Sequence, residues 1–292
     1  MLFRPKTTSE RHAWLGTGWA SATFVAIALA PAAHAQFQVE LKTDHQNFVR
    51  FAPVIATVTV RNYGARPVII GGTNQTARLF FDITRLPGTP VPALTKRLLR
   101  SETVLLPQHE AALQVNLAPH YAIHTAASYT VRAVIETGGE LYFSGPTNIR
   151  TQHGLTIAKT TTTRHGYRKL ARVYTLRYIP RRRNEVLFLC SENEEATESY
   201  GVATLGTIVR IRRPTLLVDQ YGNAHVLHQS SPEYFTHSVV GPNGRRRHSQ
   251  LYRAAASGIV LQKAPDGGVD VSGGFPVGRS DDQNLPAPPM PR

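Results

Sequence analysis

The sequence is poor in cysteine: Cys190 is the only one among 292 residues. An internal disulfide therefore cannot form, and each folded domain must be stabilised by its apolar core. Cys190 ends the apolar run 186–189, and we expect it to be a small buried residue rather than a reactive thiol or a metal ligand. Hydrophobic residues make up 41% of the chain and charged residues 18%, which indicates folded domains rather than a disordered chain.

Acidic residues are also scarce, with 19 Asp and Glu against 33 Lys and Arg. This lowers the expectation of a paired-carboxylate hydrolase. The chain has no Gly-x-Ser-x-Gly nucleophile motif and no glycine-rich phosphate loop. The sequence therefore predicts no catalytic residue and no cofactor, and an enzyme or an enzyme inhibitor stays as an alternative.

Three histidines, His225, His228 and His237, together with Asp219, are a set of candidate metal ligands. Residues three apart on a strand point to opposite faces of the sheet. His225 and His228 could share an ion only across a β-bulge. We therefore predict no metal site.

Long apolar runs are missing except near the start of the chain. Arg4, Lys6 and Arg11 precede an uncharged stretch over residues 13–30, and Ala33-His34-Ala35 has the small-x-small pattern of a signal-peptidase site. The apolar part is shorter than the roughly 20 residues of a membrane span. We predict a signal peptide over residues 1–35, cleaved near Ala35, and an exported protein (periplasmic or extracellular) without a transmembrane span after cleavage. A retained N-terminal anchor is the alternative.

Residues 36–152 show short strands between turn signals. Phe37, Val39 and Leu41 alternate with polar residues, as on a half-buried strand. Residues 129–136 reach Gly138-Gly139 and return as residues 141–144, which predicts a hairpin. Seven or eight short strands without helical periodicity predict a β-sandwich, and with it an all-β fold class.

Two groups of residues in this region resemble a known family. They are residues 41–44, Phe48, 53–54, 58–60 and Asn62 near its start, and residues 117–121 and 128–133 near its end. Their pattern is similar to that of bacterial immunoglobulin-like modules of the macroglobulin and proteinase-inhibitor types. Ala127 stands where these modules usually carry glycine. The resemblance implies an immunoglobulin-like sandwich and leaves the function open, because such modules serve many roles.

Residues 153–261 form a second, smaller β-rich region of uncertain topology. Clean alternation over 172–179 and the apolar run 186–190 predict strands. Two hairpins follow, over 216–228 and 234–252, and the second turns at Asn243-Gly244. The first hairpin resembles one from sialidase-like propeller blades, but a propeller needs at least about four such repeats. Residues 262–292 are rich in Gly and Pro and predict a flexible tail in which 269–275 is a candidate last strand.

Arginine is abundant in the second region, in three runs at strand ends or turns. The candidate anion-binding residues are Arg181, Arg182, Arg183, Arg210, Arg212, Arg213, Arg245, Arg246 and Arg247. Converging guanidinium groups would bind a phosphate-rich or otherwise anionic polymer. The alternative is a solvated rim, partly neutralised by the acidic residues of segment 192–198. No nucleic-acid-binding motif is present, so no nucleic-acid partner is expected.

An exported protein without disulfides indicates a bacterial product. The sequence thus favours a non-enzymatic exported binding or scaffolding protein of the bacterial envelope. Its partner would be another envelope protein or an anionic polymer. A module that binds anionic polymers or carbohydrate is the first alternative, and the oligomeric state stays open.

Overall fold

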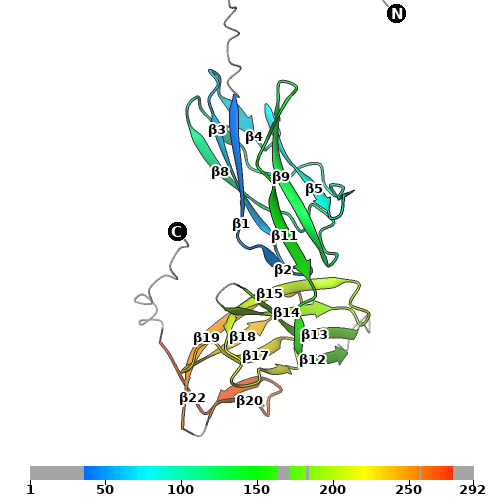
Figure 1. Ribbon diagram of the computed structural model, residues 1–292. Helices are drawn as coiled ribbons and strands as arrows, with labels where there is room; N and C mark the ends of the chain where they lie inside the picture. The colour runs from blue at the N-terminus through cyan, green and yellow to red at the C-terminus, as the bar shows by residue number, and fades with distance from the viewer. Residues whose placement is uncertain (1–35, 164–170, 182–183, 257, 279–292) are drawn as a thin grey trace, which may run out of the picture. The chain divides into compact units, whose positions relative to one another are not determined.

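The computed structural model describes residues 36–163, 171–181, 184–256 and 258–278. Every regular element in these ranges is a β-strand, and the strands form five sheets (Figure 1). The predicted all-β fold class is confirmed. The predicted signal peptide and its cleavage site lie outside the described residues. Over those same four ranges, no helix has the length and apolarity needed to cross a bilayer.

The first region contains two sheets. The smaller has the antiparallel order β1-β3-β8, and the larger has the order β2-β11-β9-β5-β4-β7, with β10 added to β9 and β6 to β5. Their bounds are β1 Phe37–Thr43, β2 Asn47–Val49, β3 Ile55–Asn62, β4 Val68–Ile70, β5 Ala77–Arg85, β6 Thr89–Pro90, β7 Thr103–Leu105, β8 Glu110–Asn116, β9 Ala127–Thr137, β10 Glu140–Phe143 and β11 Thr147–Gln152. The hairpin predicted around Gly138-Gly139 is confirmed as β9–β10.

The two sheets of the first region bury one common core. Alternate residues of β1, β3 and β5 point inward, as Val39, Val58 and Val60 do from the smaller sheet. Tyr121 lies in the same core, where its hydroxyl accepts a hydrogen bond of 2.9 Å from the backbone N–H of Phe81. The period of two in the sequence is therefore the signature of sheets with one buried face.

The second region contains a four-stranded sheet, β12-β13-β14-β15, a five-stranded sheet, β16-β17-β18-β19-β22, and the pair β20-β21. Their bounds are β12 Leu155–Thr163, β13 Ala171–Pro180, β14 Glu185–Glu192, β15 Ser199–Ile208, β16 Thr215–Val218, β17 Ala224–Gln229, β18 Tyr234–Val240, β19 Arg246–Ala254, β20 Val260–Lys263, β21 Val269–Ser272 and β22 Gly274–Pro276. Both predicted hairpins are confirmed, as β16–β17 and β18–β19.

The central strands of the four-stranded sheet, β13 and β14, are buried on both faces. One face, with Leu187 and Leu189, packs against Ala224 and Val226 of the five-stranded sheet. The other face packs against two residues of the first region, Val49 and Ala52. A strand buried on both faces reads as a continuous apolar run rather than an alternating one, which explains the composition of β14.

The segment expected to be a flexible tail contributes two strands. β21 pairs with β20 across a turn at Gly267, and β22 pairs with β19 after Gly273. Both glycines have positive φ, 78° and 76°, so they serve turns between short strands. Composition alone does not separate such turns from a linker. Residues 279–292 of the expected tail lie outside the described residues.

Candidate functional site

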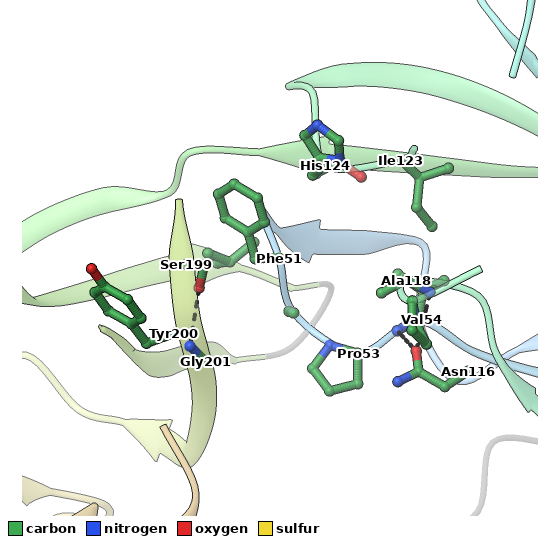
Figure 2. A pocket seen from close by; sticks show the side chains of 14 residues that line it. Phe51, Pro53, Val54, Asn116, Ala118, Ile123, His124, Ser199, Tyr200 and Gly201 are labelled. Carbon is green, nitrogen blue, oxygen red and sulfur yellow. Dashed lines mark hydrogen bonds between the residues drawn. The ribbon is translucent and has the colours of Figure 1, made fainter. Parts of the chain in front are cut away.

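A pocket of about 310 Å³ is the best candidate for a binding site. Four parts of the sequence line it: Val49 with residues 51–54, residues between Asn116 and His124, Thr151, and residues 199–201 (Figure 2). Val54 and Ile123 are buried and give it an apolar wall. A volume of this size lies at the small end of ligand sites in proteins.

Phe51 holds an unusual backbone conformation in this pocket. Its φ is 63°, in the left-handed region that bulky side chains rarely adopt. The ring stacks on the imidazole of His124, with centroids 5.5 Å apart and planes within 6°, and the guanidinium of Arg50 lies 4.9 Å from its centroid. Such a conformation costs about 1–3 kcal/mol and persists where the surroundings fix it.

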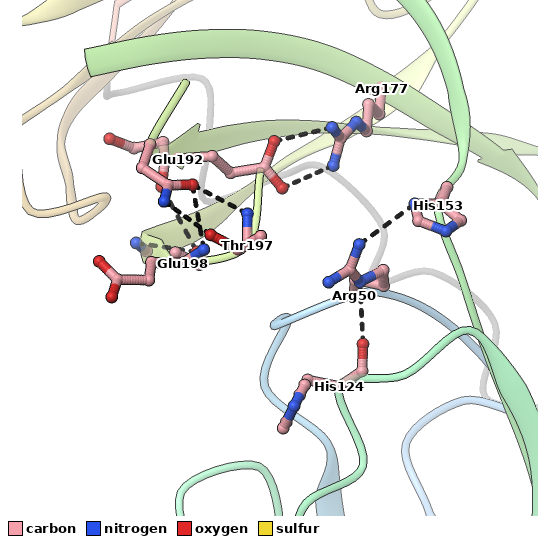
Figure 3. Close-up of polar contacts among 11 residues, drawn as sticks. Arg50, His124, His153, Arg177, Glu192, Thr197 and Glu198 are labelled. Atoms are coloured by element: carbon pink, nitrogen blue, oxygen red, sulfur yellow. Dashed lines mark hydrogen bonds and ion pairs between the residues drawn. The ribbon is translucent and has the colours of Figure 1, made fainter. Parts of the chain in front are cut away.

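Arg50 is not one of the residues that line the pocket, but several contacts hold it beside two that do, Phe51 and His124. Its Nε donates to the backbone oxygen of His124 at 2.9 Å, and its Nη1 lies 3.5 Å from Nδ1 of His153 (Figure 3). Its backbone N–H donates to the carbonyl of Gln152. No carboxylate of the described residues comes within ion-pair distance of its guanidinium, so Arg50 is a positioned cation without an acidic partner.

Two polar side chains of the lining, Thr151 and Asn116, each have a hydrogen-bonding group without a partner among the described residues. The hydroxyl of Thr151, a residue only 3% exposed, has no hydrogen-bond partner among the described residues. The side-chain oxygen of Asn116 accepts from the N–H groups of Val54 and Ala118, and its amide NH₂ donates to no described group. A buried hydroxyl without a partner is costly, so it marks a place where a ligand or an ordered water belongs.

A buried ion pair lies on the face of the four-stranded sheet that Val49 and Ala52 cover. Arg177 donates two hydrogen bonds to Glu192, at 2.8 and 2.7 Å, and the Glu192 side chain is 1% exposed (Figure 3). Glu192 was expected in a solvated loop; instead it ends β14 as the partner of Arg177. Burial raises the pKa of the nearby Cys190 thiol to about 12, so the thiol is held neutral.

The arginines proposed to bind anions make individual contacts within the protein. Arg210 forms a two-pronged ion pair with Glu185, at 2.5 and 2.9 Å, and lies over the ring of Tyr178. Arg181 approaches Nε2 of His45 at 2.6 Å. Arg182 and Arg183 lie outside the described residues.

The remaining arginines lie elsewhere on the second region. Arg212 packs over Phe235, and Arg213 donates to the carbonyl of Ile157. Arg245, Arg246 and Arg247 are exposed.

Two of the three runs lie near one end of β15 and the third lies near the other, since Arg181 is in the β13–β14 turn beside Glu185, the partner of Arg210. The turn before Arg245 packs on Gly201, near the start of that strand, whereas Arg210 pairs with Glu185 beside its end at Ile208. Gly201 and Ile208 are seven positions apart on one strand, or about 23 Å at 3.3 Å per residue. The described members of the three runs are thus spread along the sheet.

Two of the histidines, His225 and His237, lie in a chain of polar contacts with Asp219. His225 Nδ1 lies 3.1 Å from Nε2 of His237, and His225 Nε2 lies 3.3 Å from Oδ2 of Asp219. His228 is on the opposite face of β17, as strand alternation predicts. Within the described part of the chain, no three His, Cys, Asp or Glu side chains are grouped so as to hold a metal ion.

Comparison with known proteins adds little to these observations. No family model matches the chain, and no curated protein does. Among solved structures, the sporulation control protein Spo0M of Bacillus subtilis aligns at 10% identity over 86% of this chain and 94% of that chain, with a TM-score of 0.26. A score this low does not establish a shared fold.

Sequence reasoning missed Phe51, Thr151 and Tyr200. No local pattern marks them, because they meet only when distant segments pack together. The one signal in the sequence was a large aromatic residue, Phe51, in a short segment between two strands. It is weak, because single apolar residues on a surface are common.

Proposed function

We propose that the protein is a non-enzymatic, exported binding protein of the bacterial envelope whose ligand occupies the pocket beside Phe51. The observation that carries this proposal is the strained backbone of Phe51 at the wall of a pocket that also contains the unpartnered hydroxyl of Thr151. Strain and an unsatisfied buried group gather where a protein is built for a ligand rather than for stability.

The lining suits binding better than catalysis. It contains one imidazole, that of His124, whose ring is stacked on Phe51, and no carboxylate. The Cys190 thiol is buried and held neutral, so it is a poor nucleophile.

We also propose that the first region is an immunoglobulin-like sandwich and that residues 1–35 direct export. The two sheets that share one core, with strand order β1-β3-β8 in the smaller, support the sandwich. The charged start, the apolar run and Ala33-His34-Ala35 support a signal peptide. Such modules present their loops for binding, and residues 50–54 form a loop between β2 and β3.

Photo-crosslinking in living cells of the source organism tests the binding role. A benzoylphenylalanine replaces Tyr200 in the pocket, and a matched variant carries it at Tyr221, which is 66% exposed in the β16–β17 turn. After illumination, intact-mass measurement should show an adduct on the first variant and none on the second. Equal labelling of both positions, or an unmodified mass for the pocket variant, would overturn the proposal.

A further inference from the structure

β19 is paired unevenly on its two sides. On one side β18 pairs with residues 246–253, whereas on the other β22 pairs only with Tyr252–Ala254 (Figure 1). The N–H of Val277 extends this second pairing by one bond, to the carbonyl of Leu251. Backbone groups of alternate residues face the same side of an antiparallel strand, so those of Ser249 point outward, as those of Leu251 do. Among the described residues no strand pairs with them there, and an unpaired edge of this kind can accept a further strand.

The uncovered half of β19 is exposed and cationic. Arg245 lies in the turn before the strand, Arg246 and Arg247 begin the strand, and all three are exposed. No carboxylate of the described residues lies within ion-pair distance of these arginines. The side chain of Arg246 donates to a neutral group, the carbonyl of Thr204, at 3.4 Å. The described part of the chain therefore leaves the positive charge of this edge without a neutralising partner.

The arginines decide which kind of strand can be added. Residues directly opposite each other on paired strands are close enough for opposite charges to attract and for like charges to repel. A second copy of this edge would bring two arginine runs to one interface, which disfavours self-pairing. We infer that the edge binds an extended acidic segment of a partner protein, which adds to the five-stranded sheet beside residues 246–250 and places its carboxylates near the arginines.

Two kinds of contact hold such a segment. Main-chain hydrogen bonds to the outward groups of Ser249 supply affinity for any extended chain, and charge-assisted bonds to Arg246 and Arg247 supply the preference for an acidic one. None of these residues lines the pocket beside Phe51. The inference therefore adds a second binding surface and does not depend on the ligand proposed for the first.

Titration of the protein of residues 36–292 with a fluorescent peptide that alternates glutamate and valine tests the inference. A matched peptide carries glutamine in place of glutamate. The acidic peptide should bind about ten-fold more tightly, because hydrogen bonds between charged groups are about twice as strong as neutral ones. Amide hydrogen exchange followed by NMR then separates strand addition from charge attraction, since an added strand should slow exchange at the N–H of Ser249.

Two charge reversals connect the preference to this edge. Arg247→Glu should weaken binding of the acidic peptide about ten-fold and should create binding of a peptide with lysine in place of glutamate. Lys42→Glu is the matched control, because Lys42 is an exposed basic residue on β1, an edge strand of the smaller sheet. It should change the affinity for neither peptide. Thermal unfolding shows that each variant is folded.

Equal affinity for the glutamate and glutamine peptides, lack of binding by both, or a preference that survives Arg247→Glu would overturn the inference. Binding that leaves exchange at Ser249 unchanged would also overturn it, because it would indicate charge attraction alone, as for an anionic polysaccharide. A last variant, Asp281→Asn with Asp282→Asn, removes the two acidic residues that follow β22 in the sequence. Binding that appears only in this variant would identify the chain's own end as the occupant of the edge and overturn the inference of a partner protein.

Discussion

Two buried histidines, His228 and His237, should make the unfolding free energy of this protein depend on pH. His228 is 1% exposed and His237 7%, and burial lowers the pKa of each ring to about 4. For His237 the neighbouring His225 and His248 add to the effect, whereas the backbone of Thr207 opposes it at His228. Nε2 of His237 faces Nδ1 of His225 at 3.1 Å.

These two rings predict a pH-dependent stability. Unfolded histidine takes up a proton near pH 6.5, whereas the folded rings stay neutral to about pH 4. The unfolded state therefore binds more protons between these values, and stability is full above pH 6.5 and falls as the pH drops toward 4. The loss should approach about 3 kcal/mol for each ring at about 1.4 kcal/mol per pKa unit.

Urea unfolding at pH 7.5 and pH 5 measures this loss. His228→Leu should remove its own share of the pH dependence, whereas His109→Ala, in an exposed turn, should not. Unfolding free energies that agree at the two pH values would contradict the prediction.

The backbone of Phe51 gives a second prediction for a single residue. Phe51→Ala and Phe51→Gly remove the same ring contacts, but only glycine accepts a φ of 63° without strain. The glycine variant should be more stable than the alanine variant by about 1 kcal/mol.

Phe143 provides the control, since it lies in β10, outside the residues with positive φ, and is 49% exposed. There the order should reverse, because glycine weakens a strand relative to alanine. The denaturant midpoints of the four variants test this prediction. If the glycine and alanine variants had the same order of stability at both sites, backbone strain at Phe51 would be refuted.

At the scale of the elements, β14 is a strand that is buried on both faces and ends in a buried charge. Its apolar residues fill two cores, and its last residue, Glu192, is buried against Arg177. Removing one partner of such a pair leaves an uncompensated buried charge, which costs about 3–5 kcal/mol.

Glu192→Gln should therefore lower the unfolding free energy by several kcal/mol, and adding Arg177→Met should restore much of it. Glu136→Gln breaks the exposed pair with Arg78 and should cost less than about 1 kcal/mol. Thermal unfolding of the three variants gives the comparison. A double variant less stable than Glu192→Gln alone would show that the unpaired charge is not the cause.

Elements with local signals were predictable from the sequence. Gly138-Gly139 and Asn243-Gly244 fix tight turns by their own backbone preferences, and both hairpins are present. The apolar run of β14 indicated a core strand, but it gave no sign that Glu192 would join that strand as a buried ion. That position depends on Arg177, which the sequence places on a different strand. The pocket was unpredictable for the same reason, because packing brings Phe51 and Tyr200 to one site.

At the scale of the whole molecule, the proposed export makes a spectroscopic prediction. The two tryptophans of the chain, Trp14 and Trp19, both lie within residues 1–35. Cleavage near Ala35 leaves a protein that contains tyrosine but no tryptophan. Protein purified from the envelope should therefore fluoresce as tyrosine alone and have the mass of residues 36–292. Tryptophan emission together with the full-length mass would indicate the retained anchor instead.

The parallel pairing of β2 with β11 joins residues 47–49 to residues 150–152. A chain that crosses a membrane from its N-terminus delivers β2 long before β11. The larger sheet of the first region therefore cannot close until the whole of that region has emerged, and β2 waits with its edge unpaired. Because pairing of strands so far apart in sequence is slow, the unpaired edge would be exposed to aggregation at this stage of the proposed export. Under the proposed export, the period before β11 emerges is therefore the one in which protection by a chaperone would matter most for this region.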